Sequence, residues 1–118
     1  MGRQLVDRWF DAFRNRDIST LERDLAEDFV HTSPFGEIKG KDAYLELVRT
    51  NAEAFFNHTI NILDVFDCGD KIAVRYIVDE MPVCECHYVE DGKISKIYAY
   101  YHFGSKPDWQ NALNPSKE

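Results

Sequence analysis

The N-terminal half of the chain repeats apolar positions at helical spacing. A first amphipathic helix is predicted from about residue 3 to residue 15, because its apolar residues recur at intervals of one, three and four. Those residues are Leu5, Val6, Trp9, Phe10 and Phe13. Asp17 is placed to cap a second, short helix that carries Leu21 and Leu25. A third helix follows Gly40 and ends near Phe56.

From Thr59 onward the apolar period changes to two, which is typical of strands. Turn residues interrupt this half at three places: Cys68-Gly69-Asp70, Glu80-Met81-Pro82 and Asp91-Gly92. A shorter strand segment, residues 29–39, lies between the second and third helices. Helices followed by antiparallel strands indicate an α+β fold. We expect a single domain over residues 1–104 and a C-terminal tail over residues 105–118.

The turn lengths predict which strand residues share a face of the sheet, because directly opposed residues do so. A two-residue turn at Asp91-Gly92 pairs Cys84 with Ala99. A three-residue loop over residues 80–82 then pairs Val78 with Cys84, and a two-residue turn after Asp67 adds the first long strand. The face assigned to the helices collects Asn61, Leu63, Val65, Ile72, Val74, Tyr76, Val78, Cys84, Cys86, Tyr88, Ile97, Ala99 and Tyr101.

The opposite face of the predicted sheet is too apolar for a solvent-facing surface. It carries Ile60, Ile62, Phe66, Ala73, Ile77, Val83, Val89, Ile94, Tyr98 and Tyr100. We therefore predict a homodimer that packs through this outer sheet face. The alternative is a register error of one residue, which would exchange inward and outward positions.

The composition limits the classes of function. The 118 residues contain no stretch near the roughly 20 apolar residues of a membrane helix, and the amphipathic N-terminus has no separate apolar signal region. A formal net charge of −7 without any basic run argues against nucleic acid or a membrane as a partner. Three cysteines, an odd number, argue against a disulfide framework and predict a cytoplasmic location.

The sequence shows no spaced Cys/His cluster of the kind that binds a metal ion. Cys84 and Cys86 share a predicted face, but a metal site would need further ligands from elsewhere. Small buried thiols are the simpler interpretation of these two residues. We expect neither a metal nor another cofactor.

The segment between the second and third helices carries the most distinctive chemistry. It is half apolar and is broken by Pro34 and two glycines. Because side chains alternate along a strand, His31, Ser33 and Phe35 point to one side. A histidine and a hydroxyl group aimed at an apolar interior are what a small binding or catalytic cavity would use.

Several short motifs follow one another in a recognisable order: Arg8-Trp9-Phe10, Arg16-Asp17-Ile18, Ser33-Pro34-Phe35-Gly36, Gly40 before a helix, and Glu90-Asp91-Gly92-Lys93-Ile94. In this order the chain resembles the nuclear-transport-factor-two-like superfamily over about Leu5 to Phe103. Within it, the similarity is to the polyketide-cyclase-like (SnoaL-like) and ketosteroid-isomerase-related group. The resemblance implies a cone-shaped fold of three N-terminal helices packed on a curved, mostly antiparallel sheet that encloses a pocket.

The sequence departs from the catalytic pattern of ketosteroid isomerases. That family uses a tyrosine in the first helix, an aspartate base before the Pro-Phe-Gly turn and a protonated acid on a late strand. The resemblance puts Trp9, Ser33 and Cys84 at these positions. Serine is no base at neutral pH and a thiol is a weak donor, so we do not expect a standard ketosteroid isomerase. The epoxide-hydrolase pattern of two aspartates and an arginine finds no support either, because Arg75 is predicted to face outward.

Two functions of different classes remain open. The first is a cofactor-independent isomerase, cyclase or hydrolase that acts on an apolar carbonyl compound, with His31 as acid/base and Tyr101 or Tyr76 stabilising an oxyanion. The second is a non-catalytic dimeric domain that binds a hydrophobic small molecule or assists a partner. In either case the predicted pocket is lined by Trp9, Phe13, Ser33, Phe35, Phe55, Asn61, Tyr76, Cys84, Cys86, Tyr88 and Ala99, together with His31 and Tyr101.

Overall fold

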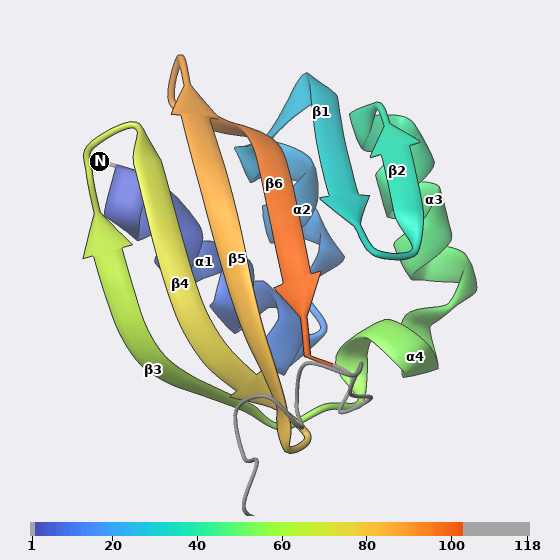
Figure 1. The fold of residues 1–118 in the computed structure, drawn as a ribbon. Coiled ribbons are helices and arrows are strands. Elements are labelled where there is room, and N and C mark those ends of the chain that lie inside the picture. The colour runs from blue at the N-terminus through green and yellow to red at the C-terminus, as the bar shows by residue number, and fades with distance from the viewer. Residues whose placement is uncertain (1, 103–118) are drawn as a thin grey trace, which may run out of the picture.

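The computed structural model describes residues 2–102 as one layer of helices on one sheet (Figure 1). Its helices are α1 (Gly2–Asn15), α2 (Ile18–Asp24), α3 (Lys41–Thr50) and α4 (Ala52–Phe56). Its strands are β1 (Leu25–Ser33), β2 (Gly36–Lys39), β3 (Ile60–Asp67), β4 (Lys71–Val78), β5 (Met81–Glu90) and β6 (Lys93–Tyr101). The predicted α+β fold is confirmed. The predicted tail, residues 105–118, lies outside the described residues.

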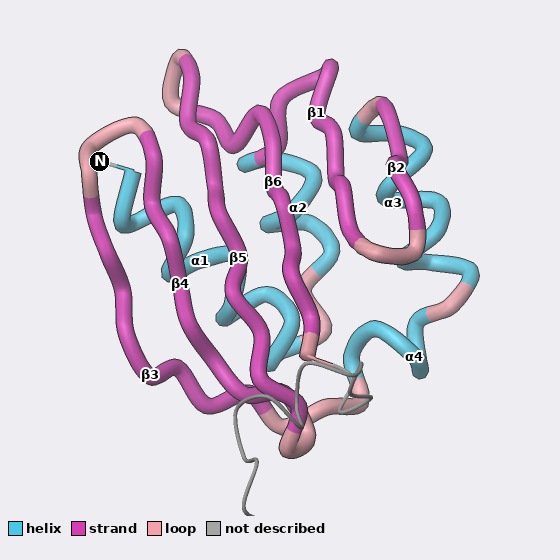
Figure 2. The backbone as a smooth tube through the Cα atoms, viewed as in Figure 1, coloured by secondary structure: helices cyan, strands magenta, loops and turns pink. Residues whose placement is uncertain are grey.

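The six strands form a single sheet in the order β2-β1-β6-β5-β4-β3. Neighbouring strands are antiparallel except β1 and β6, which are parallel. Figure 2 shows the strands as one curved layer with the helices behind it. The sheet does not close into a barrel, because its edge strands β2 and β3 each pair with one neighbour. Any interior space is therefore bounded by both the sheet and the helices.

The predicted helices form for the reasons that the sequence indicated, with one difference. The Asp17 carboxylate caps α2 by accepting from the backbone N–H of Thr20 at 3.2 Å. The third predicted helix divides at Asn51 into α3 and α4. The Asn51 side-chain amide donates to the Leu47 carbonyl oxygen at 3.0 Å, and such local bonds compete with continued helix.

The predicted register of β5 is wrong by three residues against β4 and by one residue against β6. The β4–β5 turn contains two residues, Asp79 and Glu80, both with positive φ, so Val78 pairs with Met81 rather than with Cys84. At the other end of β5, Glu90 pairs with Lys93 as predicted, but a β-bulge in β6 makes Ser95 an extra residue. The Ser95 hydroxyl donates to the Tyr88 carbonyl oxygen at 3.2 Å.

These two departures reverse every side chain along β5. Val83, Glu85 and His87 are buried against the helices, whereas the predicted inward residues Cys84, Cys86 and Tyr88 lie on the outer face. The structure thus corrects the sequence-based placement of these three residues.

A second bulge corrects the placement of Asn61. In β3 the pairing with β4 shifts between Ile62 and Asp64, which leaves Leu63 as the extra residue. Before the bulge Ile60 and Ile62 share the inner face with Val78 and Tyr76, so Asn61 belongs to the outer face. These two isoleucines were predicted to face outward, and that prediction is wrong as well.

The outer face of the sheet is consequently more mixed than the sequence predicted. Val83 and Ile94 leave it for the core, where they are almost fully buried. Phe66 and Tyr100 remain on the surface, 57% and 60% exposed. Between them lies an ion pair, in which Arg75 Nε donates to Asp64 Oδ2 at 2.8 Å. A homodimer through this face stays a prediction.

Candidate functional site

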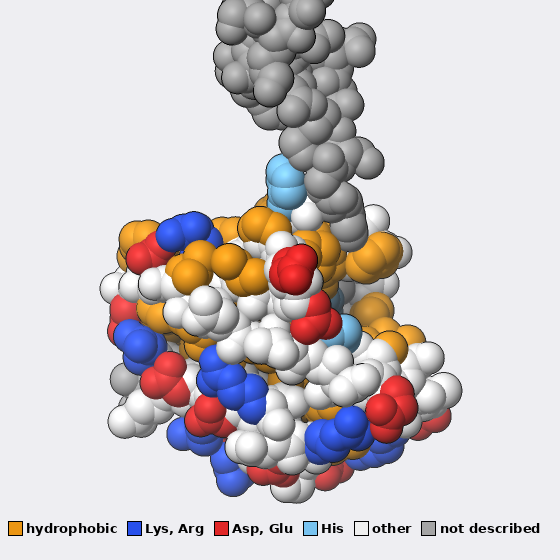
Figure 3. Space-filling view, turned by 90° about the horizontal axis from the view of Figure 1, so that it is seen from below, with side chains coloured by type: hydrophobic (Ala, Val, Ile, Leu, Met, Phe, Trp, Pro, Cys, Tyr) orange, Lys and Arg blue, Asp and Glu red, His pale blue; other side chains and the backbone are white. Residues whose placement is uncertain are grey.

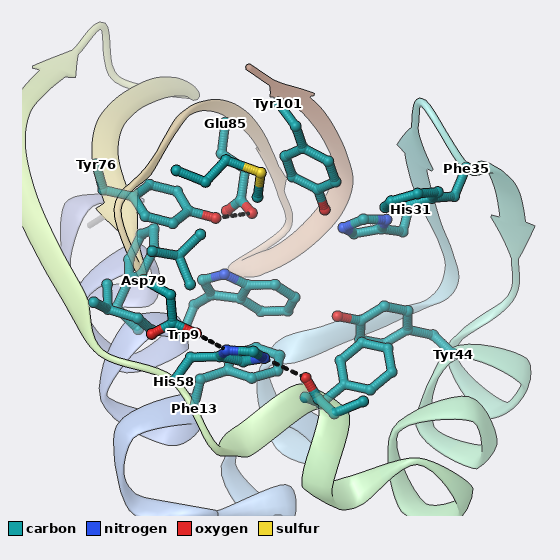
Figure 4. Close-up of a pocket in the computed structure, with 16 residues that line it drawn as sticks. Trp9, Phe13, His31, Phe35, Tyr44, His58, Tyr76, Asp79, Glu85 and Tyr101 are labelled. Atoms are coloured by element: carbon teal, nitrogen blue, oxygen red, sulfur yellow. Dashed lines mark hydrogen bonds and ion pairs between the residues drawn. The ribbon is translucent and has the colours of Figure 1, made fainter. Parts of the chain in front are cut away.

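A cavity of about 570 Å³ lies between the helices and the inner face of the sheet (Figure 4). Its walls come from α1, α4, the start of α3 and the strands β1, β3, β4, β5 and β6. The lining residues are Trp9, Phe10, Phe13, His31, Phe35, Tyr44, Ala54, Phe55, His58, Ile60, Tyr76, Val78, Asp79, Met81, Glu85 and Tyr101. A space of this size suits a small organic ligand.

Aromatic rings form most of the cavity wall. Trp9 contacts Phe13 edge-on, with ring centroids 4.7 Å apart, and stacks on Tyr44 at 5.9 Å. Phe10 contacts Tyr76 edge-on at 4.9 Å. These residues are nearly fully buried, so contacts between rings hold the wall in place. The wall therefore favours a flat, apolar ligand.

His31 is a polar group on this apolar wall. It lies on β1 opposite Ile97 of β6 and faces the helices together with Phe29. Its ring stacks on Tyr44, with centroids 5.2 Å apart and an interplanar angle of 24°. Burial lowers the pKa of His31, although the charge of Glu85 acts in the opposite direction. The imidazole is therefore neutral near pH 7, the form in which it can accept a proton.

Tyr101, the last residue of β6, lies beside His31. In Figure 4 its hydroxyl group points toward the His31 ring. Its own ring contacts Phe35 at 5.7 Å. Burial and the nearby Glu85 carboxylate raise the pKa of Tyr101 to about 12. The hydroxyl thus stays protonated at neutral pH and can donate a hydrogen bond to a ligand oxygen.

A buried carboxylate, that of Glu85, lies on the next strand, β5. Glu85 Oε2 accepts from the Tyr76 hydroxyl at 2.7 Å, and Oε1 accepts from His87 Nε2 at 2.9 Å. Burial by itself would raise the pKa of Glu85, but the bonds from His87 and Tyr76 outweigh it and lower the pKa. Burial and the same carboxylate raise the pKa of Tyr76 well above its ordinary value. Glu85 is therefore ionised and Tyr76 is a neutral donor.

A second polar pair, His58 and Asp79, joins α4 to the β4–β5 turn at the cavity's rim. The Asp79 carboxylate bonds to His58 Nδ1 and also accepts from the Thr59 backbone N–H at 2.8 Å. The other ring nitrogen of His58 bonds to the Ala54 carbonyl oxygen. The bond to Asp79 raises the pKa of His58, with burial opposing and Ala54 assisting. Both ring nitrogens face acceptors, which suits the protonated imidazolium.

Seven of the residues predicted for the site lie on the cavity wall: Trp9, Phe13, His31, Phe35, Phe55, Tyr76 and Tyr101. Six others lie elsewhere: Ser33, Asn61, Cys84, Cys86, Tyr88 and Ala99. The bulges and the β4–β5 turn move Asn61, Cys84, Cys86 and Tyr88 to the outer face. Ser33 and Ala99 line a separate hollow of about 210 Å³ with Tyr98 and Tyr100. The Ser33 hydroxyl accepts from the Phe35 backbone N–H at 3.1 Å, a local turn contact.

Sequence reasoning missed Glu85, His58 and Asp79 as cavity residues. A two-residue turn at Asp79-Glu80 would have predicted the inward position of Glu85, because alternation along β5 then follows from Val78. For His58 there was no such signal, since its position depends on where α4 ends. Tyr44 lies in the third predicted helix but was not predicted as a cavity residue.

The surface at the cavity's end of the molecule is apolar on one side and charged on the other (Figure 3). Figure 3 views the molecule from the end where α4 and the β4–β5 turn lie. Hydrophobic side chains gather in the upper part of that view, whereas charged side chains dominate the lower part.

Within residues 2–102 no three His, Cys, Asp or Glu side chains come together as a metal site would need. None of the helices in that range could span a membrane.

Comparisons with solved structures identify the fold. An NTF2-like protein of unknown function from Cytophaga hutchinsonii superposes with a TM-score of 0.75 at 16% identity, over 97% of this chain and 96% of that chain. A candidate polyketide cyclase from Sinorhizobium meliloti gives 0.71 at 24% identity, over 81% and 93%. A candidate ketosteroid isomerase from Kribbella flavida gives 0.72 at 22% identity, over 89% and 80%.

These identities are low, so the structural matches establish the fold and not an activity. None of the curated proteins matches the chain. The SnoaL-like domain, in contrast, matches residues 6–97, which include both helices and sheet and most of the cavity wall. On this match, the chain belongs to the family of SnoaL-like domains.

Proposed function

We propose that this protein binds a small apolar carbonyl compound and moves a proton on the carbon beside the carbonyl group. The observation that carries the proposal is the neutral, buried His31 on the wall of an aromatic cavity, next to the Tyr101 hydroxyl. Proteins of the same fold described as a candidate polyketide cyclase and a candidate ketosteroid isomerase agree with chemistry of this class.

In the proposed reaction His31 accepts the proton and Tyr101 stabilises the charge that develops. The neutral imidazole takes a proton from the carbon next to the carbonyl, and the electron pair moves onto the carbonyl oxygen. The Tyr101 hydroxyl donates a hydrogen bond to that oxygen. Return of the proton from His31 to a different carbon shifts a double bond; attack of the enolate on a second carbonyl closes a ring. Neither outcome consumes an oxidant or a reductant.

The proposal is tested by exchange of the acidic C–H protons of a tetralone, a bicyclic ketone, with deuterated water. Proton NMR should show faster exchange with the wild-type protein than with free imidazole at equal concentration. We expect the rate to fall by about a hundredfold or more in His31→Gln and by roughly as much in Tyr101→Phe, because each loses a group that acts in the transition state.

The matched controls lie next to these residues on the other side of the sheet. Thr32→Ala and Tyr100→Phe should exchange the ketone at the wild-type rate, since neither side chain lines the cavity. If the wild-type protein binds the ketone but exchanges its protons no faster than free imidazole does, the catalytic proposal is wrong. The second candidate function, a ligand-binding domain, then stands. That candidate is favoured by the aromatic wall, which can hold a ligand without any chemistry.

A further inference from the structure

The Glu85 carboxylate is a charged group in the cavity that the proposed proton transfer does not use. Its side chain is only 5% exposed, yet it borders the cavity. Figure 4 places it between Tyr76 and Tyr101, on the inner face of the sheet. Burying an ionised carboxylate is costly unless its oxygens accept hydrogen bonds. The number of donors around Glu85 therefore indicates what else the cavity should hold.

The protein supplies fewer donors than this carboxylate can use. An ionised carboxylate has about four acceptor positions. Within the described residues Glu85 receives one bond on each oxygen, from Tyr76 and from His87. Because these donors hold the carboxylate in its ionised form, Glu85 can accept further hydrogen bonds but cannot donate one. This distinguishes it from the protonated acid that ketosteroid isomerases use.

A neutral hydroxyl group is the ligand group that fits this acceptor best. A carboxylate or phosphate on the ligand would be repelled by Glu85 at close range. An ammonium group would have to lose its hydration on entering the cavity, which costs free energy in a buried site. Its only counter-charge would be the Glu85 carboxylate, which already accepts hydrogen bonds from Tyr76 and His87. A hydroxyl group loses little solvation and gains a charge-assisted hydrogen bond.

The position of Glu85 relative to His31 sets the shape of that ligand. Strand β6 separates β1 from β5, so the two backbones lie about 10 Å apart, or two strand spacings. A ligand whose carbonyl lies at His31 and Tyr101 therefore reaches Glu85 with its opposite end. A fused-ring skeleton would hold these two oxygen atoms apart and would also fit the aromatic wall.

We propose that Glu85 is a specificity-determining residue that selects polycyclic ketones carrying a hydroxyl group opposite the reacting carbonyl. The position of the carbonyl group depends on the proposed function. The preference for a hydroxyl group depends on Glu85 alone. A buried charged acceptor that still has room for a donor favours a ligand that supplies one over a ligand that cannot.

Calorimetric titration with three matched probes tests the proposal: a tetralone, its analogue with a hydroxyl group on the far ring, and the methyl ether of that analogue. We expect wild-type protein to bind the hydroxyl probe about tenfold or more tightly than the other two, as a hydrogen bond to a charged group implies. Equal binding of the three probes would overturn the inference, and so would tighter binding of the corresponding ammonium probe.

Two variants assign the preference to Glu85. In Glu85→Gln the preference for the hydroxyl probe should fall to less than about threefold, because the neutral amide is a weaker acceptor. Glu90→Gln, at the exposed end of the same strand, should keep the wild-type preference. Should Glu85→Gln not fold, the wild-type probe series still tests the proposal, because equal binding of the three probes overturns it.

The exchange experiment and the probe series test the two proposals separately, so either proposal can be wrong while the other holds. Deuterium exchange into the unsubstituted tetralone tests His31 and Tyr101 without any hydroxyl group. If the protein catalyses exchange but binds the three probes equally, only the proposed role of Glu85 is wrong. If it prefers the hydroxyl probe but catalyses no exchange, the catalytic proposal is wrong and the cavity is a binding site selective for hydroxyl groups.

Discussion

The two ends of the helix–sheet layer differ in how completely they are filled. Near the β3–β4 and β5–β6 turns, side chains of α1 and α2 pack against the sheet without leaving space, and Val6, Leu21, Leu25 and Ile94 are at most 1% exposed. Near α4 and the β4–β5 turn the same layer surrounds the cavity of about 570 Å³. Both ends are rich in apolar residues, so hydrophobic content does not distinguish a core from a ligand site.

The difference lies in shape and in polar atoms. The filled end is built from aliphatic side chains, which interdigitate closely. The open end is built from rings, several of which carry a hydroxyl or ring nitrogen, and these groups keep a geometry that aliphatic side chains could not hold. We therefore expect substitutions at the filled end to change stability and substitutions at the open end to change ligand binding.

The strongest contrast is expected between Phe29, in the middle of β1, and Phe35, in the β1–β2 turn. Phe29 is fully buried, whereas Phe35 is 78% exposed at the cavity. Phe29→Ala should lower the free energy of unfolding by about 3–5 kcal/mol, because it leaves a void in close-packed surroundings. Phe35→Ala should cost under about 1 kcal/mol but weaken tetralone binding. Urea denaturation and calorimetry measure the two quantities; similar stability losses in both variants would contradict the comparison.

An intermediate effect is expected at Asp24, which joins α2 to α1 at the filled end. Its nearly buried carboxylate accepts from Arg8 Nε at 2.7 Å and from Arg23 Nε at 3.1 Å. Burial would raise the pKa of Asp24, but the two arginines outweigh it and lower the pKa. The folded pKa thus lies below the unfolded value of about 3.9. The stabilisation is present above that value and is lost as the pH falls through the folded pKa.

Asp24→Asn should therefore lower the free energy of unfolding by about 1–3 kcal/mol at neutral pH, and by less under acidic conditions below pH ~4. Urea denaturation at several pH values measures this. Asp11→Asn is the matched control, because Asp11 forms an ion pair with Arg14 on the exposed surface of α1. Its effect should stay within about 0.5 kcal/mol. A pH-independent loss in Asp24→Asn would show that packing, not charge, is responsible.

The smallest effect is expected at the open end, at the pair His58 and Asp79. The pKa of His58 is raised, chiefly by Asp79, so its stabilising contribution is fully present below its unfolded pKa of about 6.5. The contribution is lost as the pH rises through the folded pKa. Because both side chains are partly exposed, His58→Gln should cost less than about 1 kcal/mol. Thermal unfolding on either side of this pH range measures it, and an equal loss at both pH values would contradict the ionic explanation.

The errors in assigning strand residues to the faces of the sheet all come from irregularities that shift the strand pairing. The helix-facing residues of β4 and β6, such as Tyr76 and Tyr101, followed correctly from alternation, because no irregularity interrupts those stretches. Along β5 the short turn shifts the pairing with β4 by three residues, and the Ser95 bulge shifts the pairing with β6 by one. Since side chains alternate, one residue is enough to exchange Glu85 for Cys84 on the cavity side.

Local sequence patterns are enough to predict the order of helices and strands, the apolar face of α1, the cap at Asp17 and the inward position of His31. Each depends on neighbours within a few residues along the chain, so local periodicity predicts it. The gathering of Glu85, His58 and Asp79 with His31 and Tyr101 around one cavity becomes visible only in the folded chain. Their positions depend on bulges, turn lengths and the break at Asn51, which long-range packing selects among locally similar alternatives.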